Sequence, residues 1–377
     1  MNMKKFFFIP FAVIMAFALA FTACNDDDDD DPGDTPNPPV TGSNVVIIDY
    51  NITNVTTWSG DSIYIIKKYD FYVQNTLTIE PGCIIKFHPA DGPYMMLGGS
   101  GTIIAQGTAA DPIVFTSYKD DAHGGDNNGD GTATSPAPKD WGEINTNGCN
   151  GSIFEYCEFY YGGDVLYNAT LTLYGDNYTV NNCTFAHNDG SYTSSAGDVG
   201  VLNASDAEAN TTITNNVFYD NVRPLSISDA FSLDASNIFH NPANTSETNT
   251  YNGIFVETIN HVSSNITWEE TEVAFVIDDN DWWILSGYHL TLANDVVLKF
   301  KAGSFIVLDD GTSSIVNYNG SGVYFTSYKD DTYKGDTNAD GSATSPAAND
   351  WGGIYDNTLT IPSPYYYGWA NILYDSY

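Results

Sequence analysis

Basic residues are scarce in this sequence. Lysine and arginine together number 12 against 48 aspartates and glutamates, which gives a formal net charge of −36, and Arg223 is the single arginine. A surface this acidic repels nucleic acid and anionic lipid. The sequence therefore predicts no nucleic-acid partner. It also disfavours a polyanionic glycan as a ligand, unless bound cations invert the local field.

Helical patterns and long apolar runs are lacking as well. Beyond residue 21 no stretch is long and apolar enough to span a membrane. Short apolar alternations broken by glycine, asparagine and aspartate predominate instead of a helical period. These features predict an all-β chain. Its length would normally suggest two domains, but a repeat array can form one continuous body.

Cysteine is used sparingly. The sequence has five cysteines, and no two of them show the C-x-x-C spacing of a metal site. In an exported protein, the four that follow Cys24 have three disulfide connectivities open to them. We predict instead that these four are buried thiols acting as small hydrophobes. They are Cys83, Cys149, Cys157 and Cys183.

Residues 1–23 have the organisation of an export signal. Lys4 and Lys5 precede an apolar run that ends at Phe21, and Ala23 stands directly before Cys24. A basic region, an apolar region and a small residue before the cut are typical of a signal peptide. The cysteine at this point resembles the lipobox of bacterial lipoproteins. The resemblance implies that Cys24 becomes the lipidated first residue and attaches the chain to outer-membrane lipid.

Residues 24–43 form an acidic and proline-rich segment. An unbroken aspartate run, Asp26 to Asp31, is followed by four prolines. Like charges repel and these prolines do not pack, so we predict a solvated tether. An acidic run directly behind a lipidated cysteine resembles the sorting signal of surface-exposed Gram-negative lipoproteins. This resemblance implies an exported protein on the outer face of the outer membrane.

One stretch of the chain occurs twice. Residues 115–121 read FTSYKDD, and the same letters return 210 positions later at residues 325–331. The D-W-G of residues 140–142 returns at the same offset. We predict a single structural body over residues 44–377 in which the repeat copies occupy about residues 54–264 and 265–377.

Each copy contains an acidic loop with the pattern D-x-N-x-D-G. Side-chain oxygens at alternate positions can converge on one hard cation, and the glycine allows a sharp turn. The glutamate expected at the twelfth position of an EF-hand loop is Ala137 in one copy and Ala347 in the other. Further oxygens must therefore come from elsewhere. The alternative is an aspartate-rich turn whose side chains cap their own backbone.

We predict a bound Ca²⁺ in each loop, because Ca²⁺ tolerates irregular oxygen cages better than Mg²⁺ does. The predicted ligands are Asp126, Asn128 and Asp130 in the first loop and Asp336, Asn338 and Asp340 in the second. The additional candidates are Asp120, Asp121 and Asp140, and Asp330, Asp331 and Asp350.

The region between the loops has a looser cycle. Phe159, Phe185, Phe218 and Phe239 recur at separations of 26, 33 and 21 residues, and a glycine or asparagine stands three residues after each of the first three. Glycine and asparagine tolerate positive φ best, so we expect each phenylalanine to end a strand just before a tight corner. Short strands, repeated corners and inward aromatics predict a solenoid.

These segments resemble right-handed parallel β-helices of the pectin-lyase-like kind. They are most similar to bacterial surface lipoproteins with the segments T-I-x-P-G-x-x-I-K-F, P-I-x-F-T-S and D-W-G-G-I around a D-x-N-x-D-G loop. The chain has the first over residues 78–87, the second over 112–117 and the third over 140–144, where Glu143 replaces the second glycine. The resemblance implies a right-handed parallel β-helix solenoid with long acidic loop insertions. This scaffold hosts enzymes, adhesins and passive stalks alike.

Two functions remain open on this scaffold. The first is a surface-tethered, Ca²⁺-stabilised β-helix that binds or displays without catalysis, and presents a long sheet to glycans or host matrix. The second is a polysaccharide lyase or glycoside hydrolase. The scarcity of basic residues favours the first, because a polyuronate lyase must neutralise the carboxylates of its substrate. Arg223 is the candidate for the arginine base that β-helix pectate lyases use.

Aromatic pairs and the chain end complete the predictions. Trp282, Trp283, Tyr160 and Tyr161 are the candidate glycan-stacking residues, and the alternative is that they pack within the sheets. The end of a solenoid leaves raw strand edges, which invite pairing. We therefore expect residues 362–369 to fold over the C-terminal end, or two chains to meet there end to end.

Overall fold

The computed structural model describes residues 44–88, 94–163, 169–190, 193–194, 197–258, 261–278, 281–358 and 365–377. The predicted signal peptide, Cys24 and the tether lie outside these residues. Within the described ranges every regular element is a β-strand. No helix there is long and apolar enough to cross a membrane.

The strands form three long sheets, two shorter sheets and two hairpins, listed here in spatial order. The first sheet has β1 (Asn44–Ile48), β3 (Ser62–Ile66), β6 (Ile84–Phe87), β9 (Ile113–Ser117), β12 (Cys157–Tyr160), β15 (Thr184–Ala186) and β20 (Val217–Tyr219). The second sheet is the longest and is called the long sheet below. It has β4 (Asp70–Val73), β7 (Tyr94–Leu97), β10 (Ile144–Asn145), β13 (Leu171–Gly175), β18 (Leu202–Ala207), β21 (Leu225–Ser228), β24 (Gly253–Glu257), β26 (Ala274–Ile277), β29 (Val297–Phe300) and β32 (Tyr324–Ser327). The third sheet has β2 (Thr56–Trp58), β5 (Thr76–Ile79), β8 (Thr102–Gln106), β11 (Ile153–Glu155), β14 (Thr179–Asn181) and β19 (Thr212–Thr214). The fourth sheet has β25 (Ile266–Trp268), β28 (His289–Leu292) and β31 (Ser314–Val316), and the fifth has β27 (Asp281–Ile284), β30 (Phe305–Leu308), β33 (Gly353–Asp356) and β34 (Tyr365–Tyr366). The hairpins are β16 (Thr193–Ser194) with β17 (Gly197–Asp198), and β22 (His240–Asn241) with β23 (Asn244–Thr248).

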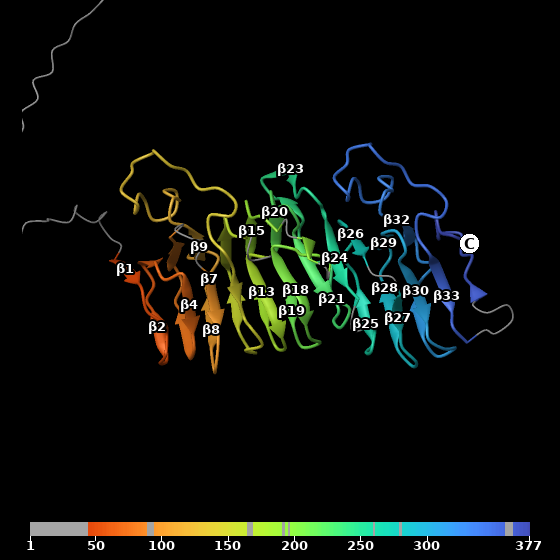
Figure 1. Cartoon of the computed structure of the whole chain (residues 1–377), viewed down its shortest axis with the longest axis horizontal. Helices are drawn as coiled ribbons and strands as arrows, with labels where there is room; N and C mark the ends of the chain where they lie inside the picture. The colour runs from red at the N-terminus through yellow and green to blue at the C-terminus, as the bar shows by residue number, and fades with distance from the viewer. Residues whose placement is uncertain are drawn as a thin grey trace, which may run out of the picture. The chain divides into compact units, whose positions relative to one another are not determined.

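The chain winds as a right-handed parallel β-helix, as the sequence predicts (Figure 1). β3, β4 and β5 lie in three different sheets, and β6 then returns to pair with β3 in parallel. In the N-terminal part of the solenoid, each coil thus adds one strand to each of the three long sheets. Alternation along the strands directs apolar side chains inward: in β5, Leu77 and Ile79 are buried while Thr76 and Thr78 lie on the outer face.

Phenylalanine rings stack through the interior. Phe115, Phe159, Phe185, Phe218 and Phe239 are buried in consecutive coils, with ring centroids 4.9, 4.6, 5.1 and 5.4 Å apart. These distances follow the spacing of neighbouring strands, about 4.8 Å. The prediction that the recurring phenylalanines point into successive coils of a solenoid is confirmed.

The cysteines beyond Cys24 are free thiols. Cys83, Cys157 and Cys183 are buried, which confirms the prediction for these three, whereas Cys149 is half-buried. Burial raises the pKa of Cys83 to about 12. It also raises the pKa of Cys157, beside Cys183.

The corners after β12, β15 and β20 differ from the prediction in one detail. The residues with positive φ are Tyr161 (64°), His187 (59°) and Asp220 (49°), each one position before the glycine or asparagine expected to adopt it. That part of the prediction was wrong. The asparagines instead form hydrogen bonds through their side chains.

Asn188, Asn221 and Asn249 form a hydrogen-bonded ladder inside these corners. Asn188 Nδ2 donates to Asn221 Oδ1 over 3.1 Å, and Asn221 Nδ2 donates to Asn249 Oδ1 over 2.9 Å. Asn221 Nδ2 also donates to the carbonyl oxygen of Phe185 over 2.8 Å. All three asparagines are buried. The ladder therefore pairs backbone groups that have no access to water.

The substitution Asn221→Ala is expected to lower the free energy of unfolding by about 3 kcal/mol, because it leaves buried donors and acceptors of two neighbouring coils without partners. Urea unfolding followed by tryptophan fluorescence measures the change. Asn54→Ala, at an exposed asparagine, is the control and should be close to neutral. A loss below about 1 kcal/mol for Asn221→Ala would mean that the ladder adds little beyond its packing.

The two repeat copies occupy different sheets. β9 and β32 carry the same F-T-S letters, yet β9 lies in the first sheet and β32 in the long sheet. The change takes place where the first sheet ends: Val217 of β20 bridges Ile238, and the hairpin β22–β23 follows. From β24 onward, the long sheet takes the position in each coil that the first sheet occupies in the earlier coils.

The C-terminal residues lie across the last coil. β34 pairs antiparallel with β33, and Ile372 forms a parallel bridge with Phe325. Trp351 Nε1 donates to the carbonyl oxygen of Leu373 over 2.8 Å. Residues 365–369 thus fold over the end as predicted, while residues 362–364 lie outside the described part. The alternative of an end-to-end dimer stays a prediction.

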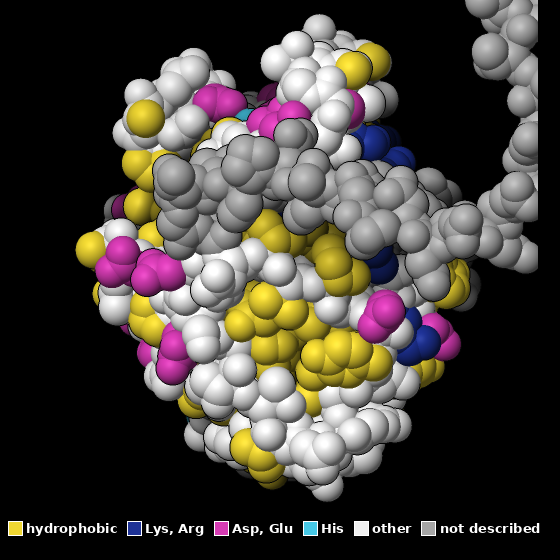
Figure 2. All heavy atoms as spheres, turned by 90° about the vertical axis from the view of Figure 1, so that its left-hand side faces the viewer, with side chains coloured by type: hydrophobic (Ala, Val, Ile, Leu, Met, Phe, Trp, Pro, Cys, Tyr) yellow, Lys and Arg dark blue, Asp and Glu magenta, His cyan; other side chains and the backbone are white. Residues whose placement is uncertain are grey.

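The N-terminal end of the described solenoid carries exposed apolar residues. In the edge strand β1, Val45 is 46% and Ile47 is 42% exposed, and Tyr50 and Val55 of the same coil are also exposed. Figure 2 shows apolar side chains gathered in the middle of this end. Edge strands of this kind pair readily with other chains.

Candidate metal centres

Two acidic loops follow β9 and β32 and project on the same side of the solenoid (Figure 1). The first loop is residues 118–143 and the second is residues 328–352. The first loop packs against β3 and β6: a Cβ built at Gly124 would lie 2.7 Å from Ile63 Cδ1 and 3.2 Å from Ile84 Cδ1. Glycine at this point is what allows the loop to approach the sheet so closely.

The repeated letters clamp the base of each loop. Asp140 accepts hydrogen bonds from Ser117 Oγ and Lys119 Nζ, both over 2.6 Å. Asp350 accepts from the equivalent serine and lysine of the second copy, both over 2.7 Å. The ring of Trp141 stacks on Phe87 with centroids 4.2 Å apart. The F-T-S-Y-K and D-W-G segments therefore bind each other and hold the two ends of each loop together.

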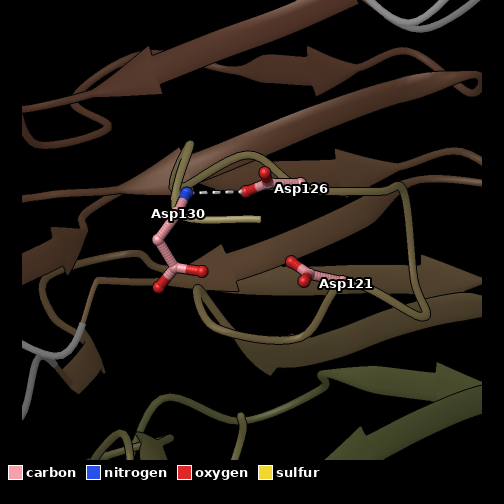
Figure 3. Close-up of side chains that lie close together, drawn as sticks. All are labelled: Asp121, Asp126 and Asp130. Carbon is pink, nitrogen blue, oxygen red and sulfur yellow. Dashed lines mark hydrogen bonds between the residues drawn. The ribbon is translucent and has the colours of Figure 1, made fainter. Parts of the chain in front are cut away.

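Three carboxylates converge within each loop, and Figure 3 shows those of the first loop. In the first loop, oxygens of Asp121, Asp126 and Asp130 all lie within 4.8 Å of one another. The second loop repeats the arrangement with Asp331, Asp336 and Asp340. The structure thus brings the two predicted aspartates of each D-x-N-x-D-G together, and adds one of the additional candidates.

The turn in each loop also has the geometry of the alternative interpretation, in which aspartate side chains cap their own backbone. Asp126 Oδ1 accepts from the backbone N–H of Gly129 over 2.7 Å, and Asp126 Oδ2 accepts from that of Gly131 over 2.8 Å. Asn128 Nδ2 donates to Asp130 Oδ2 over 3.1 Å, so its amide braces the turn. Asn338 does the same for Asp340. Their role as ligands stays a prediction.

The remaining candidates have other partners. Asp120 accepts from Thr116 Oγ1 and bonds His123 Nδ1, both over 2.6 Å, and Asp330 accepts from Thr326 Oγ1 over 2.6 Å. Asp140 and Asp350 are held in the clamps. Of the six additional candidates, therefore, only Asp121 and Asp331 join the clusters of three carboxylates.

Buried oxygens without partners distinguish these clusters from ordinary turns. Asp121 Oδ1, Asp130 Oδ1 and Asp331 Oδ1 are inaccessible to water and have no hydrogen-bond partner in the described structure. Burial and the carboxylates of Asp126 and Asp130 raise the pKa of Asp121. A buried carboxylate oxygen without a partner is costly unless a cation or a donor satisfies it. The residues present therefore fit a hard divalent cation such as Ca²⁺.

A buried lysine lies beneath each loop, and sequence reasoning assigned it no role. Lys86 Nζ donates to the carbonyl oxygens of Asp120 (2.7 Å) and Gly125 (2.9 Å). Lys299 Nζ donates to the carbonyl oxygen of Gly335 (2.7 Å) and to Thr337 Oγ1 (2.8 Å). Burial lowers the pKa of each lysine to about 8. The available signal was a lysine flanked by apolar residues in the I-K-F and L-K-F strands of both copies.

His123 gives the first loop a pH dependence. The hydrogen bond with Asp120 raises the pKa of His123, and nearby Glu158 acts in the same direction while Lys86 opposes it. A raised histidine pKa stabilises the fold fully below the unfolded value of about 6.5, and the gain is lost as pH rises through the folded value. His123→Gln should therefore cost about 1.5 kcal/mol at pH 5.5 and less at pH 8.5. Urea unfolding at the two pH values tests this, with Tyr333→Phe at the equivalent position of the second loop as control.

One of the aromatic candidates was wrong. Trp282 is fully buried, its ring stacks on Trp268 at 5.3 Å, and its Nε1 donates to Asp229 Oδ2 over 3.2 Å, so it cannot stack on a glycan. Trp283 is half-buried. Tyr160 and Tyr161 are half-buried too, with their rings 6.1 Å apart. A glycan-stacking role for these three stays a prediction.

Arg223 has a structural environment. It is buried, and its guanidinium carbon lies 4.4 Å from the centroid of Tyr251 and 5.7 Å from that of Phe255. Its Nη1 donates to the carbonyl oxygen of Gly190 over 3.2 Å. These contacts enclose the arginine among aromatic rings, where a polymeric substrate has no access.

The fold and the paired loops define a class: a right-handed parallel β-helix with two long acidic loops. A family model described as a pectate-lyase like beta helix domain matches residues 50–167. The matched stretch includes the first coils and the whole first loop. Searches of curated proteins and of solved structures gave no match.

Proposed function

We propose that this chain is a surface-anchored, non-catalytic β-helix whose two acidic loops bind Ca²⁺ and whose sheets bind or display to glycans or host matrix. The observation that carries the proposal is the duplicated cluster of three carboxylates with partnerless buried oxygens. Asp121, Asp126 and Asp130 would hold the first ion. Asp331, Asp336 and Asp340 would hold the second.

The donor set favours Ca²⁺ over other cations. All six residues offer carboxylate oxygens, which hard cations prefer. In each loop the three aspartates stand five and four residues apart in the sequence, so their oxygens do not form a regular cage. Ca²⁺ accepts such irregular coordination, whereas Mg²⁺ demands near-octahedral geometry. Bound Ca²⁺ would supply structural charge neutralisation rather than chemistry.

Contacts of the basic residues weigh against the alternative of a polysaccharide lyase. A lyase base needs a free lone pair next to its substrate. Lys86 and Lys299 lie beside the carboxylate clusters and have a lowered pKa, but both are buried and use their protons to bind loop oxygens. Arg223 is enclosed by aromatic rings. These residues therefore serve the fold.

Anchoring at the cell surface is the second part of the proposal. It is supported by the lipobox-like cysteine and the acidic run behind it, both outside the described residues. In the native host, protease added to whole cells should degrade the protein. The variant Cys24→Ala should lose its membrane association. Protection of the wild-type protein in intact cells would place it inside the envelope instead.

The binding role is tested with the mature chain on a glycan array in 1 mM Ca²⁺, together with assays for new reducing ends and for unsaturated uronate. Binding without turnover is expected. Turnover on any glycan would overturn the proposal in favour of a polysaccharide lyase or glycoside hydrolase. Absence of binding to every glycan and to extracellular-matrix proteins would remove the binding role.

A further inference from the structure

A pocket opens at a corner of the solenoid that shares no residue with the acidic loops. It encloses about 550 Å³, within the range of small-molecule sites. Its polar and aromatic lining comes from three places along the chain: Tyr174 at the end of β13, Asp206 and Glu208 at the end of β18, and Ser263 and Ser264 between β24 and β25.

The pocket forms where the regular stack is interrupted. The third sheet ends at β19 and the fourth begins at β25, while Leu233 between them bridges Trp268 of β25. The corner after β18 has the four residues 208–211, whereas the connection after β24 has the eight residues 258–265. The longer connection supplies Ser263 and Ser264 as one wall.

Tyr174 is an exposed aromatic residue on a fixed backbone. Its side chain is 54% exposed, and a Cβ built at Gly148 would lie 3.5 Å from Tyr174 Cδ1, so the ring rests against that turn. The backbone N–H of Tyr174 donates to Thr146 Oγ1 over 2.8 Å, and its carbonyl oxygen accepts from the hydroxyl of Tyr178 over 2.6 Å. A fixed, exposed ring can receive the apolar face of a sugar at little entropic cost.

Two acidic residues line the pocket together with Tyr174. Asp206 is the register partner of Tyr174 on the neighbouring strand, about 4.8 Å away along the sheet. No hydrogen bond to the Asp206 carboxylate is found in the described part of the chain. The backbone N–H of Glu208 donates to the carbonyl oxygen of Gly175 over 2.8 Å, which places this second acidic residue at the same edge, where it lines the pocket. Both side chains are acceptors for hydroxyl groups.

The charge of the lining selects the ligand. Neither lysine, arginine nor histidine is among the described lining residues. The two carboxylates therefore repel uronates and sulfated sugars, while the hydroxyl groups of a neutral sugar can donate to them. Ser263 and Ser264 add hydroxyls that can both donate and accept.

We propose that this pocket binds a neutral sugar unit of a glycan, which stacks on Tyr174 and donates hydrogen bonds to Asp206 and Glu208. The inference rests on the proposed glycan-binding function, and it names the site and the chemical class of the ligand. Tyr174 supplies affinity and the carboxylates supply selectivity against acidic sugars.

Titration calorimetry of the mature chain in 1 mM Ca²⁺ tests the site, with neutral cello-, xylo- and malto-oligosaccharides and with trigalacturonate as probes. At least one neutral oligosaccharide should bind, and trigalacturonate should not. Tyr174→Ala and Asp206→Asn should each weaken binding at least tenfold, whereas Tyr174→Phe should retain it. Tyr288→Ala, at an exposed tyrosine outside the pocket, is the matched control, and thermal unfolding verifies that each variant is folded.

The outcomes separate this inference from the proposed function. Wild-type affinity in both Tyr174→Ala and Asp206→Asn would overturn the pocket, and the glycan-binding function would stand at another site. Tighter binding of trigalacturonate than of every neutral probe would overturn the ligand class. Binding to no probe here would also overturn the inference. Only a failure on the full glycan array as well would overturn the glycan-binding function.

Discussion

Ca²⁺ in 100-fold excess over its dissociation constant is expected to raise the free energy of unfolding by about 2.7 kcal/mol for each loop, because on our proposal the ion binds the folded state and not the unfolded chain. With both loops occupied the gain is about 5 kcal/mol, a large part of the stability of an ordinary domain. Denaturant unfolding of chelator-treated protein, with and without added Ca²⁺, measures it. Calorimetry gives the number of ions bound.

Single substitutions assign the gain to its loop. Asp121→Asn should remove the Ca²⁺ response of the first loop, and Asp331→Asn that of the second, so that each variant keeps about half of the gain. The double variant should show none. Asp49→Asn, at an exposed aspartate outside both clusters, should respond as the wild type does.

Hydrogen exchange locates the effect along the solenoid. Each coil contacts mainly its neighbours, so a change at one loop should be felt in the adjacent strands and fade beyond them. Asp121→Asn should increase exchange around β3, β6 and β9, and Asp331→Asn around β26, β29 and β32. Uptake of no Ca²⁺ by the wild-type chain would refute both assignments.

Lys86→Met is expected to lower the free energy of unfolding by about 3 to 5 kcal/mol. The side chain is fully buried, and its ammonium group binds two carbonyl oxygens of the loop beneath three carboxylates. Methionine fills a similar volume but leaves these oxygens without a donor and the carboxylates without a counter-charge. Urea unfolding in the absence of Ca²⁺ gives the clearest measurement.

Two comparisons make this prediction specific. Lys299→Met should have an effect of the same order, because Lys299 likewise donates to two oxygens of the second loop, one a carbonyl and one the hydroxyl of Thr337. Lys68→Met, which removes the surface ion pair with Asp70 at 2.7 Å, should leave stability close to that of the wild type. Where Lys86→Met is still folded, it should bind Ca²⁺ more tightly, since a positive charge near the ion is gone. Weaker Ca²⁺ binding would show that the lysine shapes the site instead.

Local patterns in the sequence predicted most of the fold. The strand-turn-strand segments, the recurrent phenylalanines and the duplicated loop each depend on neighbouring residues, and the structure confirms the coils they imply. The change of sheet between the copies was not predictable in this way. It depends on where the first sheet ends after β20, which is a tertiary event that neither copy encodes in its own letters.

The candidate site was predictable in part for the same reason. Asp126 and Asp130 share one turn, and a short motif specifies that turn. Asp121 joins them, and Lys86 becomes buried, only because the loop folds back on β3 and β6. Trp282 was misassigned although alternation along a strand could have excluded it: with Ile284 it forms the inward pair of β27, which leaves Trp283 outside.

Both acidic loops lie on one side of the solenoid even though they leave different sheets (Figure 1). The long sheet runs without a break from β10, which follows the first loop, to β32, which precedes the second, so their separation is fixed. A polymer that repeats along its length at that separation would engage the two proposed ions in one encounter. Its second contact would then be intramolecular, and avidity could exceed the affinity of either loop by about 10² to 10⁴.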